Sequence, residues 1–65
     1  MSKLKETRFF KGMNQYQLAN LAQVHQSRIS LIEKGYAKPR PGEKVRLARA
    51  LGVKVEDLWS ENGDR

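Results

Sequence analysis

The chain has 65 residues with no cysteine and one histidine, which excludes a disulfide framework and a cysteine- or histidine-based zinc site. Its length suits one small domain of marginal stability. Thirteen Lys and Arg residues against seven Asp and Glu residues give a net charge of +6. Residues 1–55 hold twelve of these basic groups but three of the acidic ones. Such a basic body favours polyanionic partners, because each neutralised phosphate releases counterions.

No segment approaches the roughly 20 apolar residues of a membrane span, and the N-terminus lacks the apolar core of a signal peptide. We therefore expect a cytoplasmic protein with no membrane partner. Apolar residues recur at helical spacing on both sides of residues 35–42, and no run alternates as a strand does. The pattern predicts an all-α fold, with one domain over residues 1–65 and a frayed tail over residues 60–65.

The first predicted helix runs from Lys3 to Lys11 and ends at Gly12, a residue suited to a helix C-terminus. The second begins after Asn14, with Gln17 three residues later completing a capping box. This helix is expected to turn three apolar residues toward the core: Leu18, Leu21 and Ala22.

A short break over residues 23–24 precedes the third predicted helix, which runs from Gln26 to Lys34. Gly35 closes it, and Ile29 and Ile32 are expected to point inward.

The fourth predicted helix has Pro41 in its first turn, where a missing N–H costs nothing, and ends at Gly52. Its expected inner stripe consists of Val45, Ala48 and Leu51. A short fifth helix is expected from Val55 to about Trp59. Together these elements predict a compact five-helix domain.

The segment from the second to the third helix has the pattern of two helices that cross at a short turn. Ala19 is small enough for the crossing point, and the apolar Val24 follows the turn. The outer face of the third helix is then formed by Gln26, Ser27, Arg28, Ser30 and Leu31. Gln, Ser and Arg side chains hydrogen-bond base edges, and a helix fits the major groove. The segment therefore predicts a helix-turn-helix.

The chain resembles the phage-repressor and Cro-like helix-turn-helix proteins, also called the XRE class. Three stretches carry the resemblance: residues 14–19 (NQYQLA), 27–35 (SRISLIEKG) and 47–53 (LARALGV). The similarity extends from about Leu4 to Trp59. It implies a lambda-repressor-like fold, double-stranded operator DNA as the ligand, a homodimer, and a bacterial, archaeal or phage origin. Gln23 departs from the pattern, since glycine is common at this place in the turn.

Carried over by position, the resemblance implies base contacts from the five outer-face residues. Because Leu31 is apolar, we expect it to lie against a thymine methyl group. Contacts with the DNA backbone are expected from Gln15, Tyr16, Lys34, Lys38 and Arg40. The resemblance also implies a structural ion pair between Arg8 and Glu33 that joins the first helix to the third.

Leu58 and Trp59 are large apolar residues at the end of a chain too small to bury all of them, so we expect both in a homodimer interface. The sequence thus predicts a sequence-specific transcription regulator, a dimeric repressor on a pseudo-palindromic operator. We expect no catalytic residues, no metal and no cofactor. Two alternatives remain open. One is an antitoxin or restriction-modification controller with the same DNA contacts, where an antitoxin would add a protein partner. The other is a protein-interaction module that lost DNA binding.

Overall fold

Five short helices follow one another in the computed structural model, which describes residues 2–59. They are α1 (Lys3–Phe10), α2 (Gln15–Ala22), α3 (Gln26–Lys34), α4 (Pro41–Leu51) and α5 (Val55–Leu58). This described part of the chain contains no strand, so the predicted all-α class is confirmed. None of its helices has the length and apolar character needed to cross a membrane. The predicted frayed tail, residues 60–65, lies outside the described residues.

The helices begin and end at residues whose side chains or backbone conformations stop the helix. The capping box before α2 is confirmed: Asn14 Oδ1 accepts from the Gln17 backbone N–H at 2.8 Å, and Gln17 Oε1 accepts from the Asn14 backbone N–H at 2.9 Å. Before α1, Ser2 Oγ accepts from the Lys5 backbone N–H at 3.1 Å, a cap that the sequence analysis missed. Such caps satisfy N–H groups that have no partner within the helix.

The turn between α2 and α3 is made by a glutamine in the left-handed region. Gln23 has φ +58°, a backbone conformation that residues other than glycine adopt infrequently. Its Nε2 donates to the Asn20 carbonyl at 2.8 Å, and the next N–H, of Val24, donates to the Ala19 carbonyl at 3.2 Å. These two bonds hold the turn although its left-handed residue is not a glycine.

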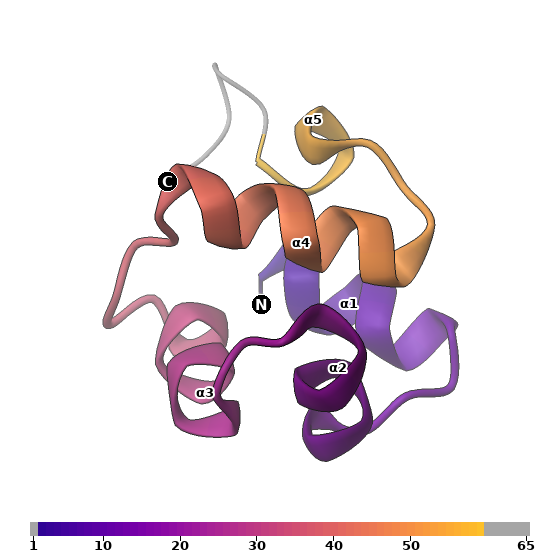
Figure 1. Ribbon diagram of the computed structural model, residues 1–65, viewed down its shortest axis with the longest axis horizontal. Helices are drawn as coiled ribbons and strands as arrows, with labels where there is room; N and C mark the ends of the chain where they lie inside the picture. The colour runs from indigo at the N-terminus through magenta and orange to yellow at the C-terminus, as the bar shows by residue number, and fades with distance from the viewer. Residues whose placement is uncertain (1, 60–65) are drawn as a thin grey trace.

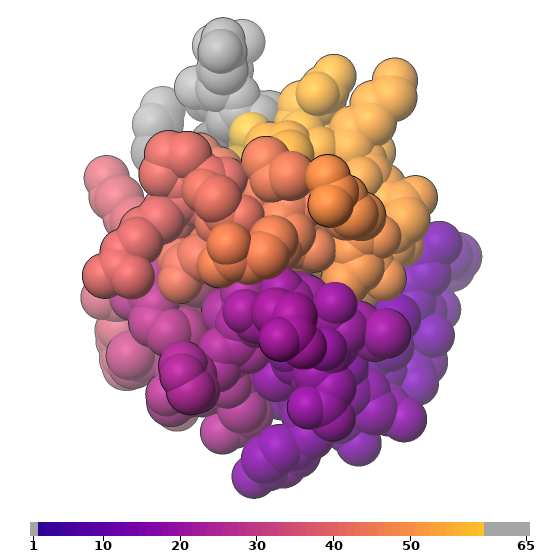
Figure 2. Space-filling model, viewed as in Figure 1, coloured from indigo at the N-terminus to yellow at the C-terminus, as the bar shows by residue number. Residues whose placement is uncertain are grey.

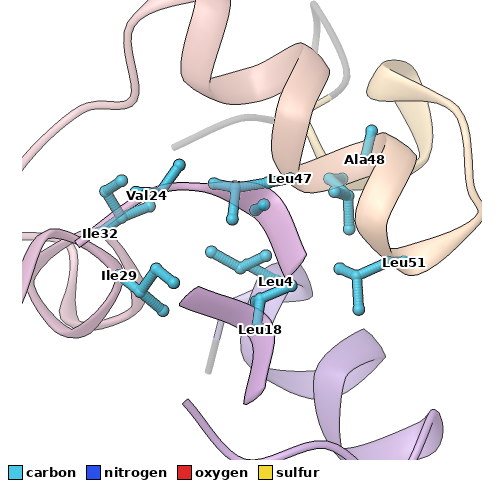
Figure 3. Close-up of a cluster of buried hydrophobic side chains, with 10 residues drawn as sticks. Leu4, Leu18, Val24, Ile29, Ile32, Leu47, Ala48 and Leu51 are labelled. Atoms are coloured by element: carbon cyan, nitrogen blue, oxygen red, sulfur yellow. The ribbon is translucent and has the colours of Figure 1, made fainter. Parts of the chain in front are cut away.

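The helices surround one apolar core. In Figure 1, α2 and α3 lie side by side below α4, with α1 behind them. The side chains of α2 and α4 meet along a continuous seam in the space-filling view (Figure 2). Figure 3 shows core side chains from α1 to α4 pointing toward a common centre. The buried apolar residues are Leu4, Leu18, Ala22, Val24, Ile29, Ile32, Leu47, Ala48, Leu51 and Leu58.

Two residues expected in this core are exposed instead. Leu21 is 61% exposed, because the inner face of α2 follows Leu18 and Ala22, one turn apart, and leaves Leu21 at its edge. Val45 is 45% exposed, and Leu47 is fully buried in its place. The expected stripe placed a residue at every third position of α4, beginning with Val45. A helix has 3.6 residues per turn, which places Leu47 on the same face as the buried Ala48 and Leu51.

The expected dimer contact at Leu58 is wrong. Leu58 is 5% exposed and belongs to the core, where α5 packs against α1 and α4. Trp59 is partly buried against the same core. Five short helices therefore enclose more apolar surface than the length of the chain led us to expect, and a leucine in the core is not available for a partner.

A pair of leucine substitutions tests this assignment. We expect Leu58→Ala to lower the free energy of unfolding by about 2–5 kcal/mol, because it leaves a cavity in a buried cluster. Leu21→Ala, the matched control at an exposed site, should change it by less than about 0.5 kcal/mol. Urea unfolding followed by circular dichroism measures both. Equal small effects would mean that α5 contributes little to the core.

Candidate nucleic-acid interface

A buried ion pair joins α1 to α3. Arg8 Nε donates to Glu33 Oε2 at 2.7 Å and Nη2 donates to Oε1 at 3.0 Å, so the two groups meet through both carboxylate oxygens. The side chains are 6% and 2% exposed. Arg8 also donates to the Met13 carbonyl at 2.9 Å, and the ring of Phe9 lies 4.8 Å from its Cζ. The structure thus brings together the two residues that the resemblance pairs.

The same carboxylate fixes the start of α3 through a glutamine. Gln15, the first residue of α2, donates from Nε2 to Glu33 Oε1 at 2.9 Å. Its Oε1 accepts from Gln26 Nε2 at 2.6 Å, at the first position of α3. The side chain of Gln26 is therefore held from behind, and its own Oε1 and second N–H remain for another partner.

Three of the five outer-face residues of α3, namely Ser27, Ser30 and Leu31, make no side-chain hydrogen bond to the rest of the described chain, whereas Gln26 is bonded to Gln15. Ser27 and Leu31 are exposed, while Gln26 and Ser30 are half-buried. Tyr16, which is 67% exposed, lines one open depression together with Gln26 at the crossing of α2 and α3. The structure thus places Tyr16, an expected backbone contact, beside Gln26, an expected base contact.

Arg28 is placed differently from its outer-face neighbours. Its Nε and Nη2 donate to Glu43 Oε2 and Oε1 at 3.0 and 2.7 Å, across to the first turn of α4. Glu43 is buried, and the hydrogen bond from Arg28 holds the pKa of its carboxyl at about 2, below the ordinary value of 4.5. Glu43 is therefore ionised at neutral pH.

The basic residues expected on the DNA backbone lie at the end of α3 and in the loop that follows it. Lys34, Lys38 and Arg40 are all exposed. The loop is tied down near its end, where the Arg40 backbone N–H donates to Glu43 Oε1 at 2.9 Å. Three cations beside the exposed face of α3 suit a polyanionic surface.

The sequence analysis missed the role of Glu43, although one signal for it was present. Glu at the third position of a helix commonly accepts from the N–H of the capping residue, and Glu43 stands three residues after Arg40. Its second partner, Arg28, is 15 residues away, which no local pattern predicts. Between residues 2 and 59, no three side chains of metal-binding type lie close enough together to hold a metal ion.

Comparison with known proteins identifies the class of this surface. A helix-turn-helix family model matches residues 10–58, which is most of the chain. The chain belongs to the helix-turn-helix family. The match includes α2, α3 and the turn between them, and it extends through α4 to α5; of α1 it includes only the last residue, Phe10.

A solved structure shares the fold of this helix-turn-helix protein. It is the restriction-modification controller protein C.AhdI from Aeromonas hydrophila, with a TM-score of 0.84 and 30% sequence identity. The similarity covers 88% of this chain and 86% of that one. None of the curated protein sequences compared with the chain matches it. The family and this neighbour together establish a DNA-binding transcription regulator.

The ion pair between Arg8 and Glu33 gives a stability prediction. Arg8→Ala or Glu33→Ala strands a buried charge and should cost about 3–5 kcal/mol. In a domain whose whole stability is about 5 kcal/mol, either variant should be largely unfolded near room temperature. The double variant Arg8→Met with Glu33→Leu should do less harm than either single change. Thermal melts of the four proteins measure this, and single variants within about 0.5 kcal/mol of the parent would contradict it.

Proposed function

We propose that the chain is a homodimeric repressor that inserts α3 into the major groove of a pseudo-palindromic operator. The observation that carries this proposal is the bond from Gln26 Nε2 to Gln15 Oε1. It leaves Gln26 with one acceptor and one N–H at the exposed start of α3. One acceptor and one donor on a fixed amide match N6 and N7 of adenine in the major groove.

The neighbouring residues of α3 complete the proposed reading surface. Ser27 and Ser30 offer hydroxyl groups that can donate to or accept from base edges. Leu31, at 40% exposed, is an apolar side chain on this otherwise polar face, and we assign it to a thymine methyl group. Such contacts act by binding, and we propose no catalytic activity, metal or cofactor for the chain.

Contacts with the DNA backbone would come from both sides of α3. Tyr16 and Gln15 lie at the start of α2, where the free second N–H of the Gln15 amide can donate to a phosphate. Lys34, Lys38 and Arg40 follow α3 along the exposed loop. Phosphate contacts on both sides would fix the register of the helix in the groove.

The proposed homodimer places two α3 helices about 34 Å apart, in successive major grooves. Because Leu58 belongs to the monomer core, the remaining candidate from the expected interface is Trp59, which is partly buried at the end of α5. The dimer contact we propose is small and is strengthened when both half-sites are occupied.

Among the alternatives, a restriction-modification controller is favoured by the similarity to C.AhdI at 30% identity over most of both chains. A controller and a phage-type repressor would share the DNA contacts and differ in the genes they control. A reporter fused to the promoters of the neighbouring genes distinguishes them. Regulation of a restriction endonuclease gene would support the controller. Regulation of a toxin gene, together with binding to the toxin, would indicate an antitoxin. Regulation of lysogeny genes would indicate a phage repressor.

Binding to duplex DNA should depend strongly on salt. If each subunit neutralises three or four phosphates, a dimer should show a slope of log K against log salt near about −6. Lys38→Ala or Arg40→Ala should weaken binding to all sequences alike and flatten the slope by about one unit. Arg49→Ala, which removes an exposed charge from α4, is the matched control and should leave the slope nearly unchanged.

Fluorescence anisotropy titrations with a duplex selected from a random pool measure these slopes, and the same selection gives the operator and its symmetry. A parent slope shallower than about −2 would place the basic charge away from the interface. Absence of duplex binding would favour the protein-interaction module instead.

A further inference from the structure

Arg28 stands where a base-reading residue was expected, yet its guanidinium is already occupied by protein atoms. Besides the two bonds to Glu43, Nη2 lies 3.3 Å from the carbonyl oxygen of Lys38, in the loop between α3 and α4. The side chain of Arg28 is 26% exposed and that of Glu43 is 7% exposed. Parallel N–H···O bonds of this kind are among the strong and geometrically specific contacts in proteins.

Glu43 is the point at which three segments of the interface meet. Its Oε1 accepts from Arg28 on α3 and from the backbone N–H of Arg40 in the loop, while its own backbone belongs to the first turn of α4. If Arg28 turned away toward a base, a buried carboxylate would lose its principal charged partner. A stranded buried charge is costly, so the arrangement favours Arg28 staying where it is.

We infer that Arg28 is a positioning residue which, with Glu43, ties the recognition helix to the loop that carries Lys38 and Arg40, and does not itself read a base. This inference rests on the proposed function, because it concerns how that interface is held together. The pair keeps the side chains that enter the groove in fixed register with those that contact phosphates.

The pairing of Arg28 with Glu43 limits how the protein can recognise guanine. Arg paired with guanine through O6 and N7 is the commonest specific contact in the major groove. With its guanidinium held by Glu43, Arg28 imposes no guanine on the operator, and base preference comes from Gln26, Ser27, Ser30 and Leu31. The operator half-site should therefore owe none of its base preferences to Arg28.

Removing the negative charge of Glu43 should weaken DNA binding, although the loss of a negative charge ordinarily strengthens it. Glu43→Gln raises the net charge of the chain by one, which by itself should tighten binding to DNA. We expect the opposite, because the loop loses the anchor that keeps Lys38 and Arg40 against the backbone. Glu6→Gln, which removes an exposed carboxylate from α1, is the matched control and should bind as tightly as the parent or slightly more tightly.

The test combines affinity, salt dependence and base preference for the parent, Arg28→Ala, Glu43→Gln, the double variant and Glu6→Gln. Arg28→Ala and Glu43→Gln should each weaken binding by about tenfold, and the double variant should be no weaker than the weaker single one. Arg28→Ala and Glu43→Gln should each flatten the salt slope. For both variants, selection from random duplexes should return the parent's base preference at every position. Arg28→Lys keeps the charge and one contact with Glu43, so it should remain folded and show a smaller loss with unchanged preference.

Three results would overturn the inference. Loss of preference for one base pair in Arg28→Ala or Arg28→Lys would make Arg28 a base reader. Tighter binding of Glu43→Gln, matching Glu6→Gln, would show that the pair positions nothing. A flatter slope in Arg28→Ala with no change in Glu43→Gln would make Arg28 a direct phosphate contact. Circular dichroism melts identify any unfolded variant, and parent protein that binds no duplex would overturn the proposed function itself.

Discussion

The carboxylate of Glu33 is the group around which the recognition unit is arranged. It receives Arg8 from α1 and Gln15 from α2, and Gln15 in turn holds Gln26 at the start of α3. A buried carboxylate without partners would be strongly unfavourable, so the three helices must keep the geometry that supplies these donors. The orientation of Gln26, the first of the proposed base contacts, is thereby linked to the stability of the domain.

The distribution of charge follows from the same constraint. Of the three acidic residues in residues 1–55, Glu33 and Glu43 are buried partners of Arg8 and Arg28. Acidic groups in this part of the chain therefore act mainly in holding helices together, which leaves Lys34, Lys38 and Arg40 exposed on one side. The net positive charge is in this way concentrated where a polyanion can reach it.

Local patterns predicted the helices because their signals are local, whereas partners distant in the sequence left no such signal. The capping box at Asn14 and the glycine after α3 placed helix ends to within a residue. Burial of Leu58 depends on α5 meeting α1, at the other end of the chain, and the pairing of Arg28 depends on a loop conformation. Within the site, family resemblance placed Arg8 and Glu33 correctly in space, but it gave Arg28 a base contact, whereas the structure pairs its guanidinium with Glu43.

The exposed face of α3, braced through Gln15, is the surface that we propose meets DNA. A titration of ¹⁵N-labelled protein with a short duplex, followed by amide resonances, tests it directly. We expect the largest shifts in the backbone amides of residues 26–31 and in the side-chain amides of Gln15 and Gln26, with little change at Phe9 and Phe10 on α1. Shifts concentrated on α1 and α5, with α3 unaffected, would contradict the account.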